Sequence, residues 1–400
     1  MTNTFIVISV QITVHFYRSK SLNIWSFRSH FSLIRKDSFQ TLLSSLICIL
    51  GGLIVGYLVL LVIEPSGAFE AIIAVMKSFL RYPGTLKLKY FGQTLVRTVP
   101  LLMCALSVLF AYKVGMFNIG VAGQYVAGAC IALYAALAWK MPWYVCMTLA
   151  MLAGGLLGAF SGWLKTKCNV NVVISGIMLN WITLYLTNLI LGTVKSPTSP
   201  YTKPLMGTNN SALIPNLGLN KLFMEERSVT IAIPLAIIIA VVIWVVLNKT
   251  KFGYELKATG NNYNAAKYCG MKENRNIILT MLISGALAGM GAGLLYLTGY
   301  EQWSCSQSSV PGMGFNGIAA AFLGGLNPIG AIFSSYFIQH ITAGGAYVDK
   351  TLYCAQVSDF ICSLIIYLCG FTLFMKTAMN RGLDKAEEKR KAKKNEGGKA

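Results

Sequence analysis

The sequence has little charge, and very little of it is acidic. Only 12% of its 400 residues are charged, with 14 Asp and Glu against 34 Lys and Arg, whereas soluble proteins average about 25% charged residues. Hydrophobic residues make up 55% of the chain and fall in runs rather than at amphipathic spacing. This composition excludes a water-soluble enzyme and a disordered or fibrous protein, and it indicates a polytopic membrane protein.

The chain also lacks the residue patterns that support catalysis, metal binding or ATP binding. Two of its 3 histidines lie in the first 40 residues and His340 stands alone, so no metal-ligand spacing occurs. Its 10 cysteines are scattered without a CxxC pair, which is typical of small buried hydrophobic side chains. No G-x-x-x-x-G-K-[ST] loop is present. We therefore expect no catalytic residue, no metal site and no cofactor bound by this chain itself.

Charge is scarce inside the predicted membrane spans as well. Asp359 is the only acidic residue well within one of them, and ion-driven carriers usually hold charge inside the membrane. An ion-coupled secondary carrier with Asp359 as its coupling site is therefore one candidate. An intramembrane enzyme is a remote one, because no paired catalytic residues exist. The spans are instead rich in Gly, Asn, Ser and Thr, which favours passage of a neutral, hydrogen-bonding solute.

Long apolar runs are what the chain has in quantity. A run of about 20 residues crosses the roughly 30 Å of membrane hydrocarbon, and the pattern predicts an all-α protein with about 8–10 transmembrane helices. The stretch 314–345 is broken at Gly324–Pro328 and predicts either a re-entrant pair or two spans. The other runs lie at 41–63, 94–112, 117–139, 143–163, 172–192, 229–248, 277–297 and 356–375.

Lys and Arg gather in three clusters, at 1–40, 249–276 and 376–400. Nucleic acid binds such clusters, but each one abuts an apolar run, so the positive-inside rule explains them better and no nucleic-acid partner is expected. Counting spans places all three clusters on the cytoplasmic side of the cell membrane, both termini included. The same count places 193–228 outside.

The sequence predicts three segments. Residues 1–40 form a cytoplasmic N-terminal extension without an assigned role, whose apolar stretch Phe5–Phe16 is too short to span. Residues 41–376 form the transmembrane domain. Residues 377–400 form a basic tail, rich in Lys and Glu without apolar periodicity, which we expect to be disordered.

Two predicted spans carry glycine at every fourth position. This spacing keeps each set on one helix face, where the missing side chains let another helix approach closely. We expect packing surfaces, or, as the alternative, a helix interface that moves. The two ladders are Gly154, Gly158 and Gly162, and Gly285, Gly289 and Gly293.

Polar amides stand at membrane depth in the segment Gly115–Gln124. Asn118 and Gln124 are costly there unless they are hydrogen-bonded or face water, so they predict either a helix cap or a solute pathway. A second Phe-Asn pair, Phe315-Asn316, precedes the broken stretch. Two such sites suggest an internal repeat of the kind that transporters use.

The longest predicted cytoplasmic loop between spans is 249–276. Asn261 to Asn264 can cap a short helix at Ala265–Cys269, and Gly270 can end it. The flanking basic residues keep this helix off the membrane, which predicts a docking element. An interfacial turn is the alternative.

Three motifs in this order resemble the permease subunits of ABC importers for branched-chain amino acids, simple sugars and nucleosides. They are G-M-F-N-I-G-x-x-G-Q at 115–124, V-I-S-G-I-M-L-N-W-I at 173–182 and L-K-A-T-G-x-N-x-x-A-A-K-Y-C-G-M at 256–271. The resemblance covers about 41–376. The first two motifs look most like the nucleoside branch and the longer of its two permeases. Ala122 departs from that branch, which usually has Glu there.

The resemblance implies a permease subunit, not an enzyme, that imports nucleosides or a related neutral polar solute. It implies membrane lipid around the chain and three partners. These are a second permease in a heterodimer, a separate ATPase that binds the ATP, and an extracellular solute-binding lipoprotein. An ABC permease for simple sugars is the alternative within the family.

The predicted site residues follow from residue type and from this resemblance. Amides can match the hydroxyls and base edges of a nucleoside, and aromatic rings can stack on a base. The ATPase contact requires small residues at its centre. The predicted solute path comprises Phe117, Asn118, Gln124, Asn180, Trp181, Phe315 and Asn316. The predicted coupling contact comprises Gly260, Ala265, Ala266 and Gly270.

Overall fold

A computed structural model describes residues 37–353 and 355–396 of the chain. The described residues form helices and loops without a strand, apart from two isolated bridges, Lys195 with Thr202 and Tyr201 with Ser304. The all-α prediction is therefore confirmed. Most of the predicted N-terminal extension, with its apolar stretch Phe5–Phe16, lies outside the described residues.

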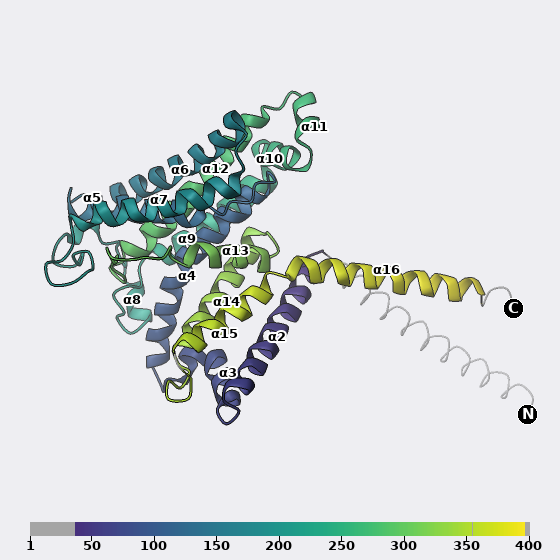
Figure 1. The fold of residues 1–400 in the computed structure, drawn as a ribbon, viewed down its shortest axis with the longest axis horizontal. Helices are drawn as coiled ribbons and strands as arrows, with labels where there is room; N and C mark the ends of the chain where they lie inside the picture. Colours follow the sequence, from purple (N-terminus) through teal and green to yellow (C-terminus); the bar gives the residue numbers. More distant parts are fainter. Residues whose placement is uncertain (1–36, 354, 397–400) are drawn as a thin grey trace, which may run out of the picture. The chain divides into compact units, whose positions relative to one another are not determined.

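The helices follow the predicted apolar runs, and Figure 1 shows their arrangement. The longer α-helices are α2 (Asp37–Ile63), α4 (Leu86–Tyr112), α5 (Val121–Leu137), α6 (Trp143–Cys168), α7 (Val172–Gly192), α9 (Ala232–Lys249), α12 (Glu273–Tyr296), α14 (Pro328–Gly345), α15 (Ala355–Cys369) and α16 (Thr372–Glu396). The shorter ones are α3 (Ala68–Lys77), α8 (Leu219–Leu222), α10 (Lys251–Asn261), α11 (Tyr263–Tyr268) and α13 (Met313–Leu323), with 3-10 turns η1 (Ser78–Arg81) and η2 (Asn210–Ala212).

Six helices in the described part of the chain are long and apolar enough to cross a membrane: α2, α4, α6, α7, α9 and α12. The shorter helices α5 and α13 are apolar too. The number and composition of these helices make the chain a multi-pass membrane protein. This agrees with the predicted fold class.

The chain divides into two compact units. One is Cys48–Phe371, and the other joins the described residues up to Ile47 with those from Thr372 onward. In the second unit, Lys376 Nζ on α16 donates a hydrogen bond to Thr41 Oγ1 on α2 at 3.0 Å. The unit Cys48–Phe371 holds all predicted site residues.

The C-terminal helices differ from the prediction. The run 356–375 is not one span, because α15 ends at Cys369 and α16 begins at Thr372. Helix α16 then continues to Glu396, where the sequence predicts a disordered tail. Lys, Glu and Ala, which dominate this tail, have high intrinsic helix propensity. An expectation of disorder based on charge and low hydrophobicity does not take that propensity into account.

Helices α4 and α12 form the centre of the Cys48–Phe371 unit. In the most apolar window of α4, 89% of the residues are buried inside the chain, against 28% in α9. Helix α12 packs on α4, α5 and α6, and α4 also packs on α13 and α14. The exposed side chains of α7 and α9 are mostly apolar, for example Leu189 and Ile238, so these faces are left for lipid or another subunit.

The broken stretch 314–345 forms two helices, α13 and α14, with a tight turn between them. Gly325 and Leu326 have positive φ angles of 66° and 54° in this turn. Asn327 then caps α14 by accepting a hydrogen bond from the backbone N–H of Ile329 at 3.0 Å, and Pro328 occupies the first turn. Both helices pack on α4.

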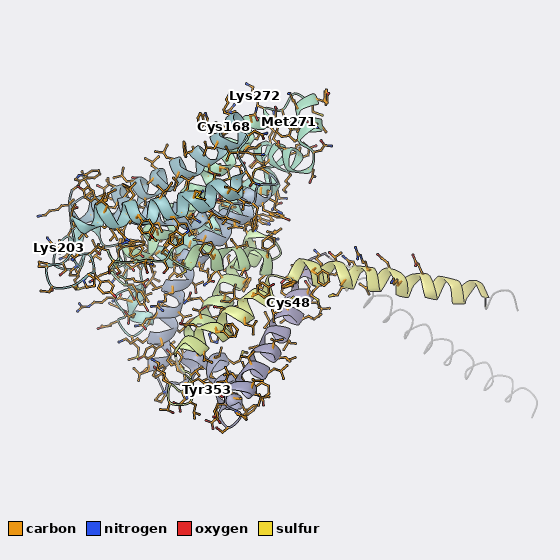
Figure 2. The ribbon with its side chains drawn as sticks, viewed as in Figure 1. Cys48, Cys168, Lys203, Met271, Lys272 and Tyr353 are labelled. Atoms are coloured by element: carbon orange, nitrogen blue, oxygen red, sulfur yellow. The ribbon has the colours of Figure 1, made fainter. Side chains whose placement is uncertain are left out.

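The two long loops lie toward opposite ends of the Cys48–Phe371 unit. Figure 2 shows Met271 and Lys272, in the loop 249–276, toward the same end as Cys168. It shows Lys203, in the loop 193–228, toward the other end. Opposite ends are what the predicted cytoplasmic and external positions of these loops require.

Candidate functional site

The two glycine ladders meet at one interface, between α6 and α12. A Cβ atom built on Gly154 would collide with the carbonyl oxygen of Gly285, and one built on Gly158 would collide with the carbonyl oxygen of Met281. A Cβ on Gly289 would collide with the carbonyl oxygen of Ala150. The two backbones are therefore in direct contact, which only glycine permits.

The outer ends of the ladders are less tightly packed. A Cβ on Gly162 would lie 3.1 Å from Ile278 Cα, and one on Gly293 would lie 2.8 Å from the flexible Met147 Sδ. Helix α5 joins the same block at Gly128, whose backbone meets that of α12. The three helices together form a closely packed wall beside which the predicted polar residues lie.

Four polar side chains form a buried network against this wall. Asn118 Nδ2 donates to Gln124 Oε1 at 2.8 Å and to Ser284 Oγ at 2.8 Å. The Ser284 and Ser107 hydroxyls share a hydrogen bond at 2.9 Å. An unpaired amide at this depth would be costly, so the network supplies each amide with a partner from within the chain.

The third predicted amide, Asn180, connects α7 to the start of α5. Its Oδ1 accepts a hydrogen bond from the backbone N–H of Gly123 at 2.7 Å, and its Nδ2 donates to the carbonyl of Ile119 at 3.1 Å. The first N–H groups of a helix have no partner within the helix, so Asn180 caps α5 from a neighbouring helix. Gly120 and Gly176 permit this approach, since a Cβ on Gly176 would lie 2.8 Å from the Gly120 nitrogen.

The predicted aromatic residues near these amides lie outside the network. The Phe117 ring is half-buried, with its centroid 6.3 Å from that of Phe322 on α13. Trp181 is exposed on α7 and stacks on Tyr185, with centroids 6.1 Å apart. Asn180 caps a helix, whereas Asn118 and Gln124 hydrogen-bond to each other, and Asn118 also to Ser284, without capping one. Their role in a solute pathway stays a prediction.

Phe315 and Asn316 lie in a groove between α13 and α15. The groove has a volume of about 430 Å³ and a mostly apolar lining, to which Phe322, Ser363 and Tyr367 also contribute. Asn316 is half-buried and Phe315 is exposed. This is an open space of solute size beside a polar amide and four aromatic side chains, those of Phe315, Phe322, Tyr367 and Phe371.

Ala122 lies beneath the first turn of α13. A Cβ on Gly314 would lie 2.6 Å from Ala122 Cβ, so α5 and α13 almost touch through their backbones. A glutamate at position 122 would push these helices apart or displace Gly314. The departure from the nucleoside branch at Ala122 therefore goes together with a close approach of α13.

The loop 249–276 contains the predicted short helix, α11. Asn262 caps it by accepting a hydrogen bond from the backbone N–H of Ala265 at 2.9 Å, and Gly270 follows it with a φ angle of 77°. A further helix precedes it, α10, which the sequence pattern does not predict. Thr250 caps α10 by accepting a hydrogen bond from the Gly253 N–H at 3.1 Å.

The predicted coupling residues on α11 have different surroundings. Ala266 is only 3% exposed and anchors the helix to the rest of the chain. Ala265 and Gly270 are exposed. Tyr268, which was not predicted, is 92% exposed. A partner would therefore meet Ala265 and Tyr268, while Ala266 holds α11 in place.

The remaining predicted coupling residue, Gly260, lies at a basic cavity. A Cβ on Gly260 would collide with the carbonyl oxygen of Lys113, so glycine is needed where α10 meets the turn after α4. The cavity has a volume of about 480 Å³, and Lys113 and Lys257 both line it. Burial, and secondly the positive charge of Lys257, lower the pKa of Lys113. An acidic group would be favoured in this cavity.

Two charged residues occur within the predicted spans. Asp359 is exposed on α15. Arg97 is half-buried on α4 and was not among the predicted site residues, although a charge in an apolar run is itself a signal. Ser107 and Ser284 carried no such signal, because only the fold brings them together. Among the described residues, no three His, Cys, Asp or Glu side chains are placed to hold a metal ion.

The model of the family described as branched-chain amino acid transport system / permease component matches residues 90–369. The guanosine ABC transporter permease protein NupP of Bacillus subtilis is 32% identical, over 73% of this chain and 84% of its own length. The nucleoside ABC transporter permease protein NupB of Lactococcus lactis is 31% identical, over 77% of this chain and 86% of its own length. The glucose ABC transporter permease protein TsgB13 of Haloferax volcanii is 29% identical, over 65% of this chain and 70% of its own length.

Two further permease proteins from the first two organisms are similar as well. NupQ of Bacillus subtilis and NupC of Lactococcus lactis are each 30% identical to this chain, over 61% and 62% of it. Each organism thus has a pair of such permeases, and this chain resembles both members. No solved structure matches the chain.

Proposed function

Because the chain belongs to the branched-chain amino acid transport system / permease component family, whose members are transport components and not enzymes, we propose that it translocates nucleosides into the cell as one permease of an ABC importer. The observation that carries this proposal is the similarity to NupP and NupB, which extends over more than four fifths of each relative, 84% and 86%. A chain that matches these permeases over most of their length has the same role, which is to form the path across the membrane while a separate subunit hydrolyses ATP.

Simple sugars are the second candidate solute, because TsgB13, a glucose permease by name, is 29% identical. The ion-coupled carrier finds no such support, since family membership favours a subunit driven by a separate ATPase. Asp359 then needs no coupling role.

Uptake by cells that lack the chromosomal gene tests the solute. Cells carrying this chain on a plasmid should regain uptake of labelled guanosine, and an excess of unlabelled adenosine or uridine should compete while glucose does not. Restored uptake of glucose alone would transfer the assignment to sugars. Uptake that persists when cellular ATP is depleted and an ion gradient is imposed would favour the secondary carrier.

The solute path of this subunit runs along the groove between α13 and α15. Asn316 offers an amide to the hydroxyls or base edge of a nucleoside, and Phe315 offers a ring for stacking. Asn118, Gln124 and Asn180 hold the adjoining wall in position through the buried network. Phe117 precedes α5, and Trp181 lies on α7, which packs against α5.

Alanine replacement of Asn316 and of Phe315 should reduce guanosine uptake while the amount of chain in the membrane stays constant. Phe333→Ala is the matched control, because Phe333 is exposed on α14 and does not line the groove. Unchanged uptake in both groove variants would remove the groove from the path.

The partners follow from the importer assignment. A second permease forms a heterodimer with this chain, as the paired relatives suggest. An ABC ATPase binds the ATP, so that this chain has no cofactor of its own, and a solute-binding lipoprotein delivers the solute from outside. Both termini and the loop 249–276 face the cytoplasm, and membrane lipid covers the outer faces.

Helix α11 is the contact with the ATPase. Its exposed side chains, Ala265 and Tyr268, lie on a helix that Ala266 anchors, so movement of the ATPase is transmitted to α10 and α12. Gly260 and Gly270 set the ends of this unit. The two lysines at the cavity attract an acidic group of the partner.

Co-purification tests this contact. Ala265→Trp should abolish recovery of the ATPase with the permease and abolish uptake, because the added ring fills the contact. Ala346→Trp is the control, since Ala346 is an exposed alanine after the far end of α14. Equal ATPase recovery in both variants would refute the docking role of α11.

A further inference from the structure

Three polar side chains follow one another along one face of α4, at positions spaced by four residues. Lys89 Nζ lies 3.9 Å from Glu226 Oε2, and Gln93 Nε2 donates a hydrogen bond to the same oxygen at 3.0 Å. The other carboxylate oxygen accepts a hydrogen bond from Ser228 Oγ at 2.9 Å. Glu226 is thus occupied by the first two members of the row.

Arg97, the third member, pairs with no carboxylate among the described residues, and its side chain interacts with that of Tyr300 instead. Its guanidinium carbon lies 5.3 Å from the centroid of the Tyr300 ring, an attractive cation–π geometry. Its Nε atom is buried without a hydrogen-bond acceptor, and Arg97 forms no ion pair with any described residue. A half-buried charge is costly unless something accepts its hydrogen bonds, so the guanidinium can receive acceptors from a molecule outside the chain.

Arg97 lies in the first half of α4, ahead of the part of that helix that packs on α13. Two turns further along the same face of α4, Cys104 packs on α13, since a Cβ on Gly317 would lie 2.6 Å from Cys104 Cβ. At the end of α4, the Tyr112 ring lies 5.5 Å from that of Phe322, near the end of α13. The two helices therefore run side by side in the same direction, and Arg97 is level with the residues that immediately precede α13.

We propose that Arg97 is a specificity-determining residue, whose guanidinium donates paired hydrogen bonds to the vicinal hydroxyl groups of the solute as it enters. This inference rests on the proposed transport function. A guanidinium is a planar fork with parallel donors, and two adjacent hydroxyl oxygens match that spacing. Nucleosides and simple sugars, the two candidate solutes, share vicinal hydroxyls and not a base. The ring of Tyr300 keeps the fork in one orientation.

Uptake of three labelled solutes tests the inference in cells that express the complete importer. The solutes are guanosine, 2′-deoxyguanosine and 3′-deoxyguanosine, and the variants are Arg97→Lys, which keeps the charge without the fork, and Arg97→Gln. Guanosine uptake should fall roughly tenfold, as for loss of a hydrogen bond to a charged group. Uptake of the deoxynucleosides should change little, because the removed hydroxyl and the removed guanidinium belong to one contact and their effects do not add.

For each strain, the uptake of each deoxynucleoside is divided by the uptake of guanosine. Comparing these ratios between strains removes the preference of the solute-binding protein, which is the same in all of them. Lys89→Gln is the matched control, because Lys89 pairs with Glu226; its effect should be equal for the three solutes. Membrane abundance of each variant is measured by immunoblot.

Equal losses for all three solutes in the Arg97 variants, or no loss at equal abundance, would overturn the inference while the transport function stands. Failure of the unaltered chain to restore uptake of any of the three would overturn both together.

Discussion

The backbones of Gly154 and Gly285 are in mutual contact, because a Cβ built on either residue would collide with the carbonyl oxygen of the other. The contact is reciprocal, and it joins two segments that lie far apart in the chain. Since neither position has room for one methyl group, the α6–α12 interface should respond to the smallest possible enlargement.

Gly158→Ala should destabilise the chain by about 1–3 kcal/mol, as expected for overpacking, because the new methyl group meets the carbonyl of Met281. Thermal unfolding in detergent measures the change. Gly51→Ala is the matched control, since a Cβ there meets nothing within 4 Å. Equal unfolding temperatures for the two variants would show that α6 and α12 are not in backbone contact.

Asn180→Ala should also destabilise the chain, by about 1–3 kcal/mol, because it leaves the buried N–H of Gly123 without an acceptor. Guanosine uptake should fall with it, since the start of α5 supports the wall of the path. Asn171 is a cap of the same residue type, but it acts locally at the exposed start of α7. If Asn171→Ala lowers the stability of the chain as much as Asn180→Ala does, the α7–α5 cap has no special role.

Stability should depend on pH through Lys113. Its pKa in the folded chain is lowered from 10.5, first by burial and then by Lys257, so the protonated amine disfavours folding. This penalty is fully present below the folded pKa and disappears as the pH rises toward 10.5. Lys113→Gln should therefore raise the unfolding temperature at pH 7 and raise it less as the pH approaches 10.

Lys221→Gln is the control, because Lys221 is exposed in the loop 193–228. It should leave the unfolding temperature unchanged across the same pH range. If the unfolding temperatures of the unaltered chain and Lys113→Gln differ by the same amount at every pH, the buried charge is not the cause of the difference.

Cysteine labelling checks the orientation. Cys269 is exposed in the loop 249–276 and should react with a membrane-impermeant maleimide only after cells are permeabilised. Leu217, 78% exposed in the loop 193–228, should react as Leu217→Cys in intact cells. Cys168 and Cys305 are replaced by Ser to remove background. If Cys269 is labelled in intact cells and Leu217→Cys is not, the chain has the opposite orientation to the predicted one.

Features that depend on neighbouring residues were predictable. Asn262 caps α11 and Gly270 follows it at positive φ, because a cap and its helix lie within a few positions of one another. The turn at Gly324–Pro328 was predictable for the same reason. Helix α10 was missed because its sequence, Lys251–Asn261, is too short and too polar to read as a span. The helical tail was missed because charge was weighed above helix propensity.

The sequence by itself determined that the chain is a helical membrane protein, and it fixed the approximate spans and the motifs of a permease. Hydrophobic length and local capping decide these properties, and both can be counted along the chain. Only the tertiary structure decided that one glycine ladder faces the other, that Asn180 caps α5, and that Arg97 lies on Tyr300 instead of an acidic residue. Those contacts join residues 57 or more positions apart, and whether a polar group pairs within the chain or stays available to a solute depends on which helices pack together.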